Sequence, residues 1–243
     1  MTMRRRFAVI DIDGTLIRWQ LYHGIVEELA RSGAIDQTRF RRVLRAREKW
    51  EQRTSDDAYK MYERELVIVY LSALSSISED QYLQAIEHTF QKHKDRVYTY
   101  TRSLIRDLKA KNYALFAISG SHNEAVELIA NYYGFDDAVG VKFPRVNGKF
   151  TGRMIETWGV KHEILEALIK KHHVSMEQSI AVGDSEGDIT MLESVKKPIV
   201  FNPTKKLFHH AQKHHWRVVL ERKNVIYTLE PSSNGYRLDS VND

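Results

Sequence analysis

Cysteine is absent from the 243 residues of this chain. Disulfide bonds and thiolate chemistry are therefore excluded, and any bound metal must be held by oxygen or imidazole ligands. Long apolar runs are also missing, because no stretch approaches the ~20 residues that cross a bilayer. A basic segment at residues 3–6 and an apolar segment at residues 7–10 imitate the start of a signal peptide, but Asp11 and Asp13 interrupt it. We therefore expect no membrane association and a cytoplasmic location.

The composition excludes disorder as the default state, since 42% of the residues are hydrophobic and the length permits a sizeable core. The formal net charge of +5 is mild for this length. It favours anionic ligands through long-range attraction, but it does not by itself indicate a nucleic acid partner. The oligomeric state stays open.

Short, nearly continuous apolar runs alternate with helical patterns along the chain. The runs lie at residues 7–10, 113–119, 179–184 and 198–201, with a fifth candidate at 216–220. Helical periodicity follows at residues 123–133, 161–172 and 188–195. Strands that are apolar on both faces are typical of a buried parallel sheet. The pattern predicts an α/β fold with a doubly wound, Rossmann-like parallel sheet.

About a hundred residues separate the first two strands, far more than the dozen or so that a crossover requires. This segment is helical in pattern at residues 21–30, 36–51, 57–74 and 79–92. We therefore predict a helical cap domain at residues 19–97, inserted into a core domain formed by residues 1–18 and 98–243. A hairpin with a tight primed turn is expected at residues 141–154, where Asn147 precedes Gly148.

Two carboxylates follow the first strand in the sequence Asp-Ile-Asp-Gly-Thr at residues 11–15. Asp11 and Asp13 are two residues apart, so on an extended backbone they point the same way at the carboxyl end of the strand, where open α/β sheets bind ligands. One carboxylate is then suited to attack phosphorus and the other to transfer protons. Taken alone, the same pattern also fits an acidic turn before a helix.

Further polar residues occur at the ends of later elements. Ser119 and Gly120 offer a hydroxyl and open backbone N–H groups for a phosphate, and Lys161 at a helix start offers a positive charge. Asp184 ends an apolar strand and Asp188 begins a helix. Hard oxygen ligands at a strand end suit Mg²⁺, although Asp188 also fits a helix cap.

In this order the motifs resemble those of the haloacid dehalogenase superfamily of phosphohydrolases, and the helical insertion resembles its phosphoserine-phosphatase-like branch. The resemblance implies that Asp11 attacks phosphorus to form an aspartyl-phosphate and that Asp13 acts as acid and base. It further implies a magnesium site and a phosphate-binding site. The resemblance assigns Mg²⁺ to Asp11, the backbone carbonyl of Asp13 and Asp184, with Asp188 as a further ligand or a supporting residue. It assigns the phosphate to Ser119, Gly120 and Lys161.

The expected activity is therefore Mg²⁺-dependent hydrolysis of a small phosphorylated metabolite. Phosphoserine is an alternative substrate, but phosphoserine phosphatases usually have an acidic residue shortly after the first motif to bind the substrate amine, and this chain has the neutral Gln20 in that stretch. Arg18 and Gln20 are the candidates for substrate contact. Transfer to an acceptor alcohol is a second alternative. A non-catalytic relative that binds anions or nucleic acid through its basic helix at residues 39–50 is a third.

Paired histidines at positions 209 and 210 and at 214 and 215 are spaced to share a helix face. Such a face can bind a borderline metal ion. No carboxylate partner is evident in the sequence, so a solvent-exposed cluster is the favoured interpretation.

Overall fold

The computed structural model describes residues 4–233 and 235–242, so residues 1–3, 234 and 243 of the predicted core lie outside the described residues. The chain divides into two compact units. The first, here called the sheet unit, comprises Met1–Gln20, His93–Val141 and Glu156–Asp243. The second, the helical unit, comprises Leu21–Lys92 and Lys142–Ile155. None of the described helices is long and apolar enough to cross a membrane.

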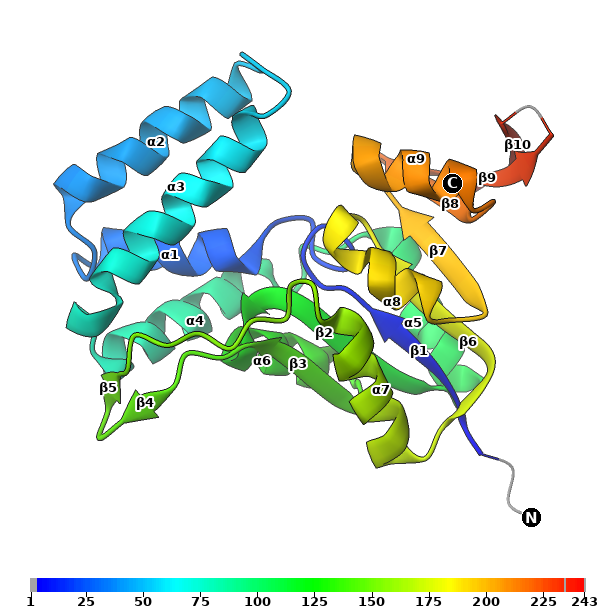
Figure 1. Ribbon diagram of the computed structural model, residues 1–243, viewed down its shortest axis with the longest axis horizontal. Helices are drawn as coiled ribbons and strands as arrows, with labels where there is room; N and C mark the ends of the chain where they lie inside the picture. Colours follow the sequence, from blue (N-terminus) through cyan, green and yellow to red (C-terminus); the bar gives the residue numbers. More distant parts are fainter. Residues whose placement is uncertain (1–3, 234, 243) are drawn as a thin grey trace. The chain divides into compact units, whose positions relative to one another are not determined.

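The sheet unit is built on one mixed sheet in the order β10-β9-β8-β7-β6-β1-β2-β3 (Figure 1). Neighbouring strands from β8 to β3 are parallel, whereas β9 and β10 join antiparallel at one edge. The strand bounds are β1 Arg6–Ile10, β2 Ala114–His122, β3 Asp137–Val141, β6 Ser175–Gly183, β7 Lys197–Phe201, β8 Arg217–Arg222, β9 Val225–Ser232 and β10 Gly235–Asn242. The predicted α/β fold with a mostly parallel sheet is confirmed, while β3, β9 and β10 were not anticipated.

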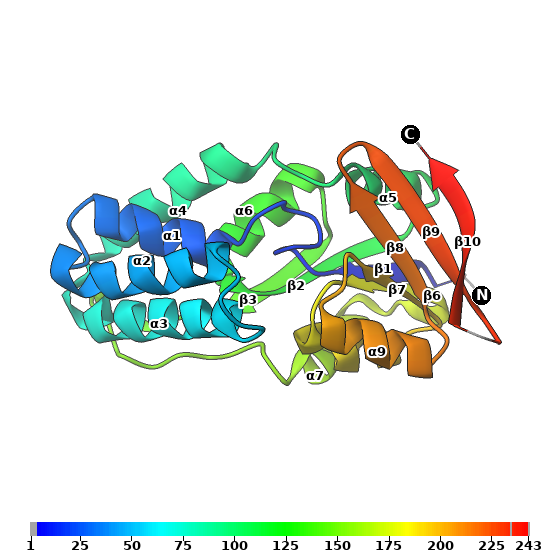
Figure 2. The same ribbon diagram turned by 90° about the horizontal axis from the view of Figure 1, so that it is seen from above.

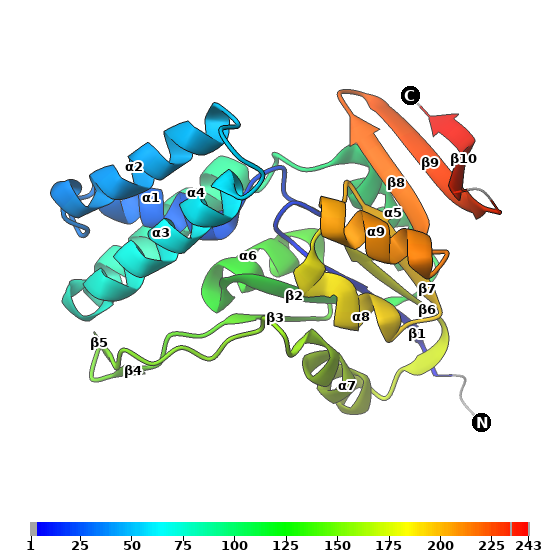
Figure 3. The same ribbon diagram turned by 45° about the horizontal axis from the view of Figure 1, so that its top comes forward.

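Helices cover both faces of this sheet. Figures 2 and 3 show α5 (Thr99–Ala110) and α6 (Asn123–Tyr133) on one side, and α7 (Lys161–His172), α8 (Ile189–Glu193) and α9 (Lys205–Lys213) on the other. Apolar side chains of the strands, such as Phe7, Phe116 and Val200, are completely buried beneath them. The two-sided cover explains why the central strands are apolar along nearly their whole length.

The helical unit contains α1 (Leu21–Arg31), α2 (Gln37–Glu51), α3 (Ala58–Ala73), a short 3₁₀ turn at Leu74–Ser76 and most of α4 (Glu79–His93). Before α4, the backbone N–H of Ser78 donates to Oε1 of Gln81 at 3.0 Å and the N–H of Gln81 donates to Oγ of Ser78 at 3.2 Å. This reciprocal pair is a capping box, which satisfies two of the otherwise unpaired donors at a helix start.

The hairpin of β4 (Arg145–Val146) and β5 (Lys149–Phe150) groups with the helical unit rather than with the core in which the sequence analysis had placed it. Asn147 and Gly148 have φ values of 51° and 73°, so the primed turn is confirmed. The ring of Phe150 lies 5.0 Å from that of Tyr82, and the guanidinium of Arg145 lies 3.3 Å from Glu79. These contacts account for the grouping, and the assignment of residues 19–97 as a cap domain stays a prediction.

Candidate active site

The polar residues of the predicted site gather at the carboxyl ends of β1, β2 and β6. Strand β1 pairs with β2 on one side and with β6 on the other, and the helices that follow these neighbours cover opposite faces of the sheet. Such a point, where the direction of winding reverses, leaves a crevice at the strand ends. Asp11 follows β1 directly, and its backbone N–H donates to the carbonyl of Val182 in β6 at 3.0 Å.

The turn after Asp11 depends on Gly14, whose φ of 77° is a conformation that side-chain-bearing residues rarely adopt. A Cβ atom at this position would lie 2.2 Å from Oδ2 of Asp184. The glycine therefore serves two needs, since it permits the turn and it leaves room for the carboxylate of Asp184 against the backbone.

Lys161 is the ionic centre of the cluster. Its ammonium donates to Oδ1 of Asp11 at 2.7 Å and to Oδ1 of Asp188 at 2.6 Å. A third hydrogen bond, of 3.0 Å, goes to the carbonyl of Ile118 in β2. Burial disfavours a charged lysine, but the two carboxylates outweigh this effect and raise its pKa above the ordinary value. Lys161 is thus a buried, charged lysine at the start of α7.

Asp188 is completely buried and has both carboxylate oxygens engaged. Besides Lys161, it accepts hydrogen bonds at Oδ2 from the backbone N–H groups of Asp184 and Ser185 and from the hydroxyl of Ser185, at 3.0 to 3.2 Å. Gly183 is required beside it, because a Cβ there would lie 2.5 Å from the Cβ of Asp188. Asp188 therefore completes the capping box of the 3₁₀ turn at Glu186–Asp188, while its side chain makes no capping hydrogen bond to α8. At the same time it fixes Lys161 and the loop that carries Asp184.

Asp13 and Ser119 form a second, connected pair. The hydroxyl of Ser119 donates to Oδ2 of Asp13 at 2.8 Å and accepts from the backbone N–H of Ser121 at 3.1 Å. Thr157, which was not predicted, is buried and donates its hydroxyl to the carbonyl of Ser119 at 2.7 Å. Nothing in the local sequence marks this residue, because its partner is 38 positions away.

Ser119 and Gly120 lie within strand β2, which continues to His122 rather than closing at Ser119 as predicted. Ser119 is fully buried, whereas Gly120 is exposed. The predicted phosphate-binding residues therefore combine a buried hydroxyl with an exposed glycine, two residues before the strand ends at His122.

Negative charge exceeds positive charge in this cluster. Carboxylate oxygens of Asp11, Asp184 and Asp188 all lie within 4.8 Å of one another. Burial raises the pKa of Asp11 to about 8; Lys161 lowers it, while Asp188 and Asp13 raise it further. Burial and the charge of Asp11 likewise raise the pKa of Asp184 well above its usual range. Because a divalent cation would relieve this repulsion, and carboxylate oxygens are the donors that Mg²⁺ prefers, the residues fit a magnesium site.

The two residues considered for substrate contact lie outside this hydrogen-bonded cluster. The guanidinium of Arg18 lies 5.2 Å from the ring centre of Tyr98, and its backbone N–H donates to the carbonyl of Arg96 at 2.8 Å. Arg18 is exposed, and Gln20, the last residue of the first segment of the sheet unit, is half-buried. A role for either in substrate contact stays a prediction.

Comparison with known proteins points to one family. The family model of haloacid dehalogenase-like hydrolases matches residues 8–193. A phosphoserine phosphatase of Archaeoglobus fulgidus is 25% identical over 206 residues, which are 82% of this chain and 53% of that protein. A phosphoserine phosphatase of Methanocaldococcus jannaschii is 32% identical over 100 residues, which are 40% of this chain and 47% of that protein. The chain thus spans about half the length of these curated relatives.

Solved structures share the fold. A Bordetella pertussis protein with unknown function has a TM-score of 0.70 at 20% identity, with 89% of this chain and 98% of that chain covered. A substrate-bound phosphoserine phosphatase has a TM-score of 0.63 at 21% identity, with 91% and 95% covered. With the family match over most of the sheet unit and the strand-end carboxylates, the chain belongs to the haloacid dehalogenase-like hydrolases and is similar to their phosphoserine phosphatases.

Proposed function

We propose that this protein is a Mg²⁺-dependent phosphatase that hydrolyses a small phosphorylated metabolite through an aspartyl-phosphate intermediate. One observation carries the proposal: Asp11 is held by the ammonium of Lys161 at the end of β1, two residues before a carboxylate hydrogen-bonded to Ser119. A nucleophile and a proton-transfer group are thereby oriented separately. Family membership and the similarity to phosphoserine phosphatases support the same reaction class.

In the first step, a carboxylate oxygen of Asp11 bonds to phosphorus and the bond from phosphorus to the ester oxygen breaks. Asp13 gives its proton to the departing alkoxide, which leaves as an alcohol. In the second step, a water molecule attacks phosphorus and loses a proton to Asp13. The acyl phosphate bond then breaks, so that Asp11 is restored and inorganic phosphate is released.

Magnesium would be held by Asp11, the backbone carbonyl of Asp13 and Asp184. When bound, it lowers the negative charge so that a carboxylate can approach an anionic phosphoryl group. Asp188 supports this site from outside, because both of its oxygens already bind Lys161 and the Asp184 loop. The sequence left Asp188 as either a ligand or a supporting residue, and its two hydrogen-bonded oxygens favour the supporting role in this proposal.

The phosphoryl group would be bound by Lys161, the Ser119 hydroxyl and the backbone N–H beside Gly120. Lys161 is charged and cannot turn to solvent, since it is buried between two carboxylates and a carbonyl. A fixed positive charge of this kind stabilises the charge that develops on the equatorial oxygens during phosphoryl transfer. The Ser119 hydroxyl has one proton, so it would donate to the phosphate in place of its present hydrogen bond to Asp13.

Phosphoserine is a second candidate substrate, favoured by the similarity to phosphoserine phosphatases. Against it, residues 17–26 contain no carboxylate to bind the substrate's ammonium group, and Gln20 is neutral.

Transfer to an acceptor alcohol uses the same intermediate and differs only in the group that attacks it. The intact pair of Asp11 and Asp13 argues against a non-catalytic, nucleic-acid-binding relative. A cytoplasmic location stays a prediction.

Hydrolysis of an aryl phosphate and of a panel of phosphorylated amino acids, sugars and nucleotides tests the proposal. We expect phosphate release that requires Mg²⁺, stops with a chelator and is lost in Asp11→Asn. Product analysis with an added alcohol separates hydrolysis from transfer. Undiminished turnover in Asp11→Asn, or binding of oligonucleotides without turnover of any ester, would refute it.

A further inference from the structure

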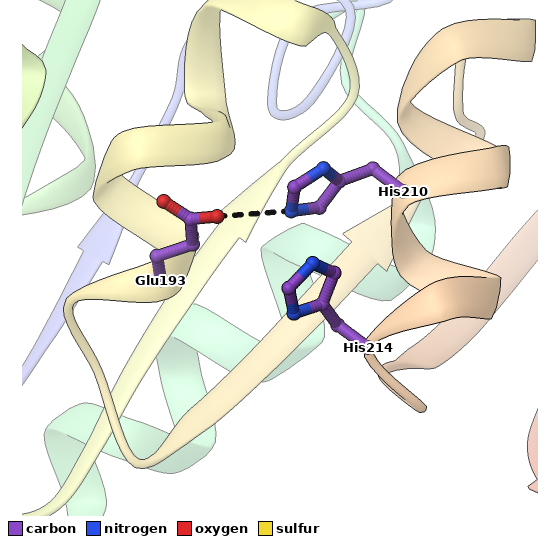
Figure 4. Close-up of side chains that lie close together, drawn as sticks. All are labelled: Glu193, His210 and His214. Carbon is purple, nitrogen blue, oxygen red and sulfur yellow. Dashed lines mark ion pairs between the residues drawn. The ribbon is translucent and has the colours of Figure 1, made fainter.

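A second group of potential metal ligands lies in the sheet unit, apart from the carboxylates after β1. It consists of Glu193 at the end of α8, His210 within α9 and His214 just after α9 (Figure 4). The sequence had suggested the histidines but offered no carboxylate. The fold supplies one, because α8 and α9 lie on the same side of the sheet and the three side chains point toward one another.

The three side chains are nearly arranged for coordination. One ligand atom from each lies within 4.8 Å of those of the other two. The imidazoles of His210 and His214 stack with centroids 4.2 Å apart and planes 12° apart, as their spacing of four on a helix allows. In tetrahedral zinc sites with bonds of 2.0–2.2 Å, ligand atoms are about 3.3 Å apart. The ligand atoms would therefore have to approach one another by up to about 1.5 Å (4.8 Å less 3.3 Å), which rotation of the exposed side chains of Glu193 and His214 toward the half-buried His210 can supply.

The contact between His210 and Glu193 is close but is not an ordinary hydrogen bond. Nε2 of His210 lies 3.0 Å from Oε1 of Glu193. Among the described residues, this buried nitrogen nevertheless has no hydrogen bond of normal geometry. Nε2 of His210 therefore lies beside the Glu193 carboxylate without a hydrogen bond that would compete with a metal ion.

The ligand set selects the class of metal. Two imidazoles and one carboxylate suit Zn²⁺ and similar borderline ions, whereas Mg²⁺ prefers oxygen donors alone. Glu193 and His214 also line a surface pocket of about 490 Å³, so two of the three side chains face open space. We propose that Glu193, His210 and His214 form a zinc-type site, distinct in residues and in ligand chemistry from the carboxylate site after β1.

Such an ion would join two helices that flank the proposed active site. Helix α8 begins directly after Asp188, and α9 begins after Thr204. At that end the loops are already connected, because the N–H of Thr204 donates to the carbonyl of Asp184 at 2.9 Å and its hydroxyl donates to Glu186 at 3.0 Å. A metal at the far end of α8 and α9 would fix the pair at both ends and stabilise the sheet unit.

Titration of the full chain with Zn²⁺, in saturating Mg²⁺ to occupy the carboxylate site, tests the proposal by calorimetry and by thermal unfolding. We expect one Zn²⁺ per chain and a higher Tm. His210→Gln and His214→Gln should each weaken binding by more than about 100-fold, since losing even an indirect partner of a ligand costs about 10–100-fold. His209→Gln is the matched control, because His209 is an exposed neighbour on α9 outside the ligand set, and it should bind Zn²⁺ as the wild type does.

Glu193→Gln separates the loss of a ligand from a folding defect. Because the Glu193 side chain is 45% exposed, this variant should weaken Zn²⁺ binding and leave the circular dichroism spectrum unchanged. Co²⁺ in place of Zn²⁺ should give visible d–d absorption that disappears in His210→Gln. Zinc binding that survives in His210→Gln and His214→Gln, that fails equally in His209→Gln, or that excess Mg²⁺ abolishes would overturn the proposal. Absence of binding by the wild type at about 100-fold molar excess would do the same.

Discussion

Replacing Lys161 with methionine tests whether this residue organises the site. The change keeps much of the side chain's volume but removes a buried ammonium bonded at 2.7 Å to Asp11 and at 2.6 Å to Asp188. The two carboxylates would then be buried without their cation. Removing one partner of a buried ion pair costs about 3–5 kcal/mol, so we expect the free energy of unfolding to fall by that amount near neutral pH.

The loss should depend on pH in a definite direction. Protonation relieves a buried, unpaired carboxylate, and burial already raises the pKa of Asp11 to about 8 with the lysine present. Without the lysine, Asp11 should hold its proton more tightly still. The folded variant therefore binds more protons than the folded wild type, so the difference in stability should shrink as the pH falls.

Urea denaturation followed by circular dichroism, in a chelator and at pH 8 and pH 5.5, measures both effects. Lys171→Met is the matched control on the same helix, because Lys171 forms an exposed ion pair with Asp137 at 2.7 Å. Exposed pairs are worth about 0–1 kcal/mol, so this control should change little. A loss for Lys161→Met no larger than for Lys171→Met, or one that grows toward low pH, would refute the reasoning.

Three further outcomes are expected. Asp13→Asn should lower phosphate release by about 10²–10⁴-fold while leaving the fold intact, and unchanged turnover would exclude its role in proton transfer. Gly14→Ala should lower both Tm and Mg²⁺ affinity, because its Cβ would meet Asp184 at 2.2 Å at a φ of 77°; an unaffected metal titration would contradict this. Burial lowers the pKa of His122 to about 3. Below about pH 6.5 this histidine is therefore protonated in the unfolded chain but stays neutral in the folded chain. Stability should therefore fall by about 1.4 kcal/mol per pH unit below that point, and urea denaturation of His122→Gln should show a shallower slope.

The local order of elements was readable from the sequence because it depends on local properties. Apolar runs predicted the central parallel strands. Helical periodicity predicted both ends of each helix from α1 to α4 to within one residue. Asp11 and Asp184 were recognisable because each directly follows such a run, and parallel strands bring their carboxyl ends to one edge. Less regular segments were missed, including β3, which contains a glycine, and the hairpin of β9 and β10.

The tertiary structure decided what each polar residue contacts. Lys161 has the sequence context of a surface lysine, yet the crossover from β3 to β6 buries it against Asp11, which lies 150 positions earlier. Thr157 and Glu193 carry no local signal, since their partners come from other elements. The grouping of the hairpin with the helical unit likewise depends on Tyr82 and Phe150 meeting across the chain. Strand and helix preferences act over a few residues, whereas hydrogen bonds, ion pairs and ligand sets join residues that only the folded chain brings together.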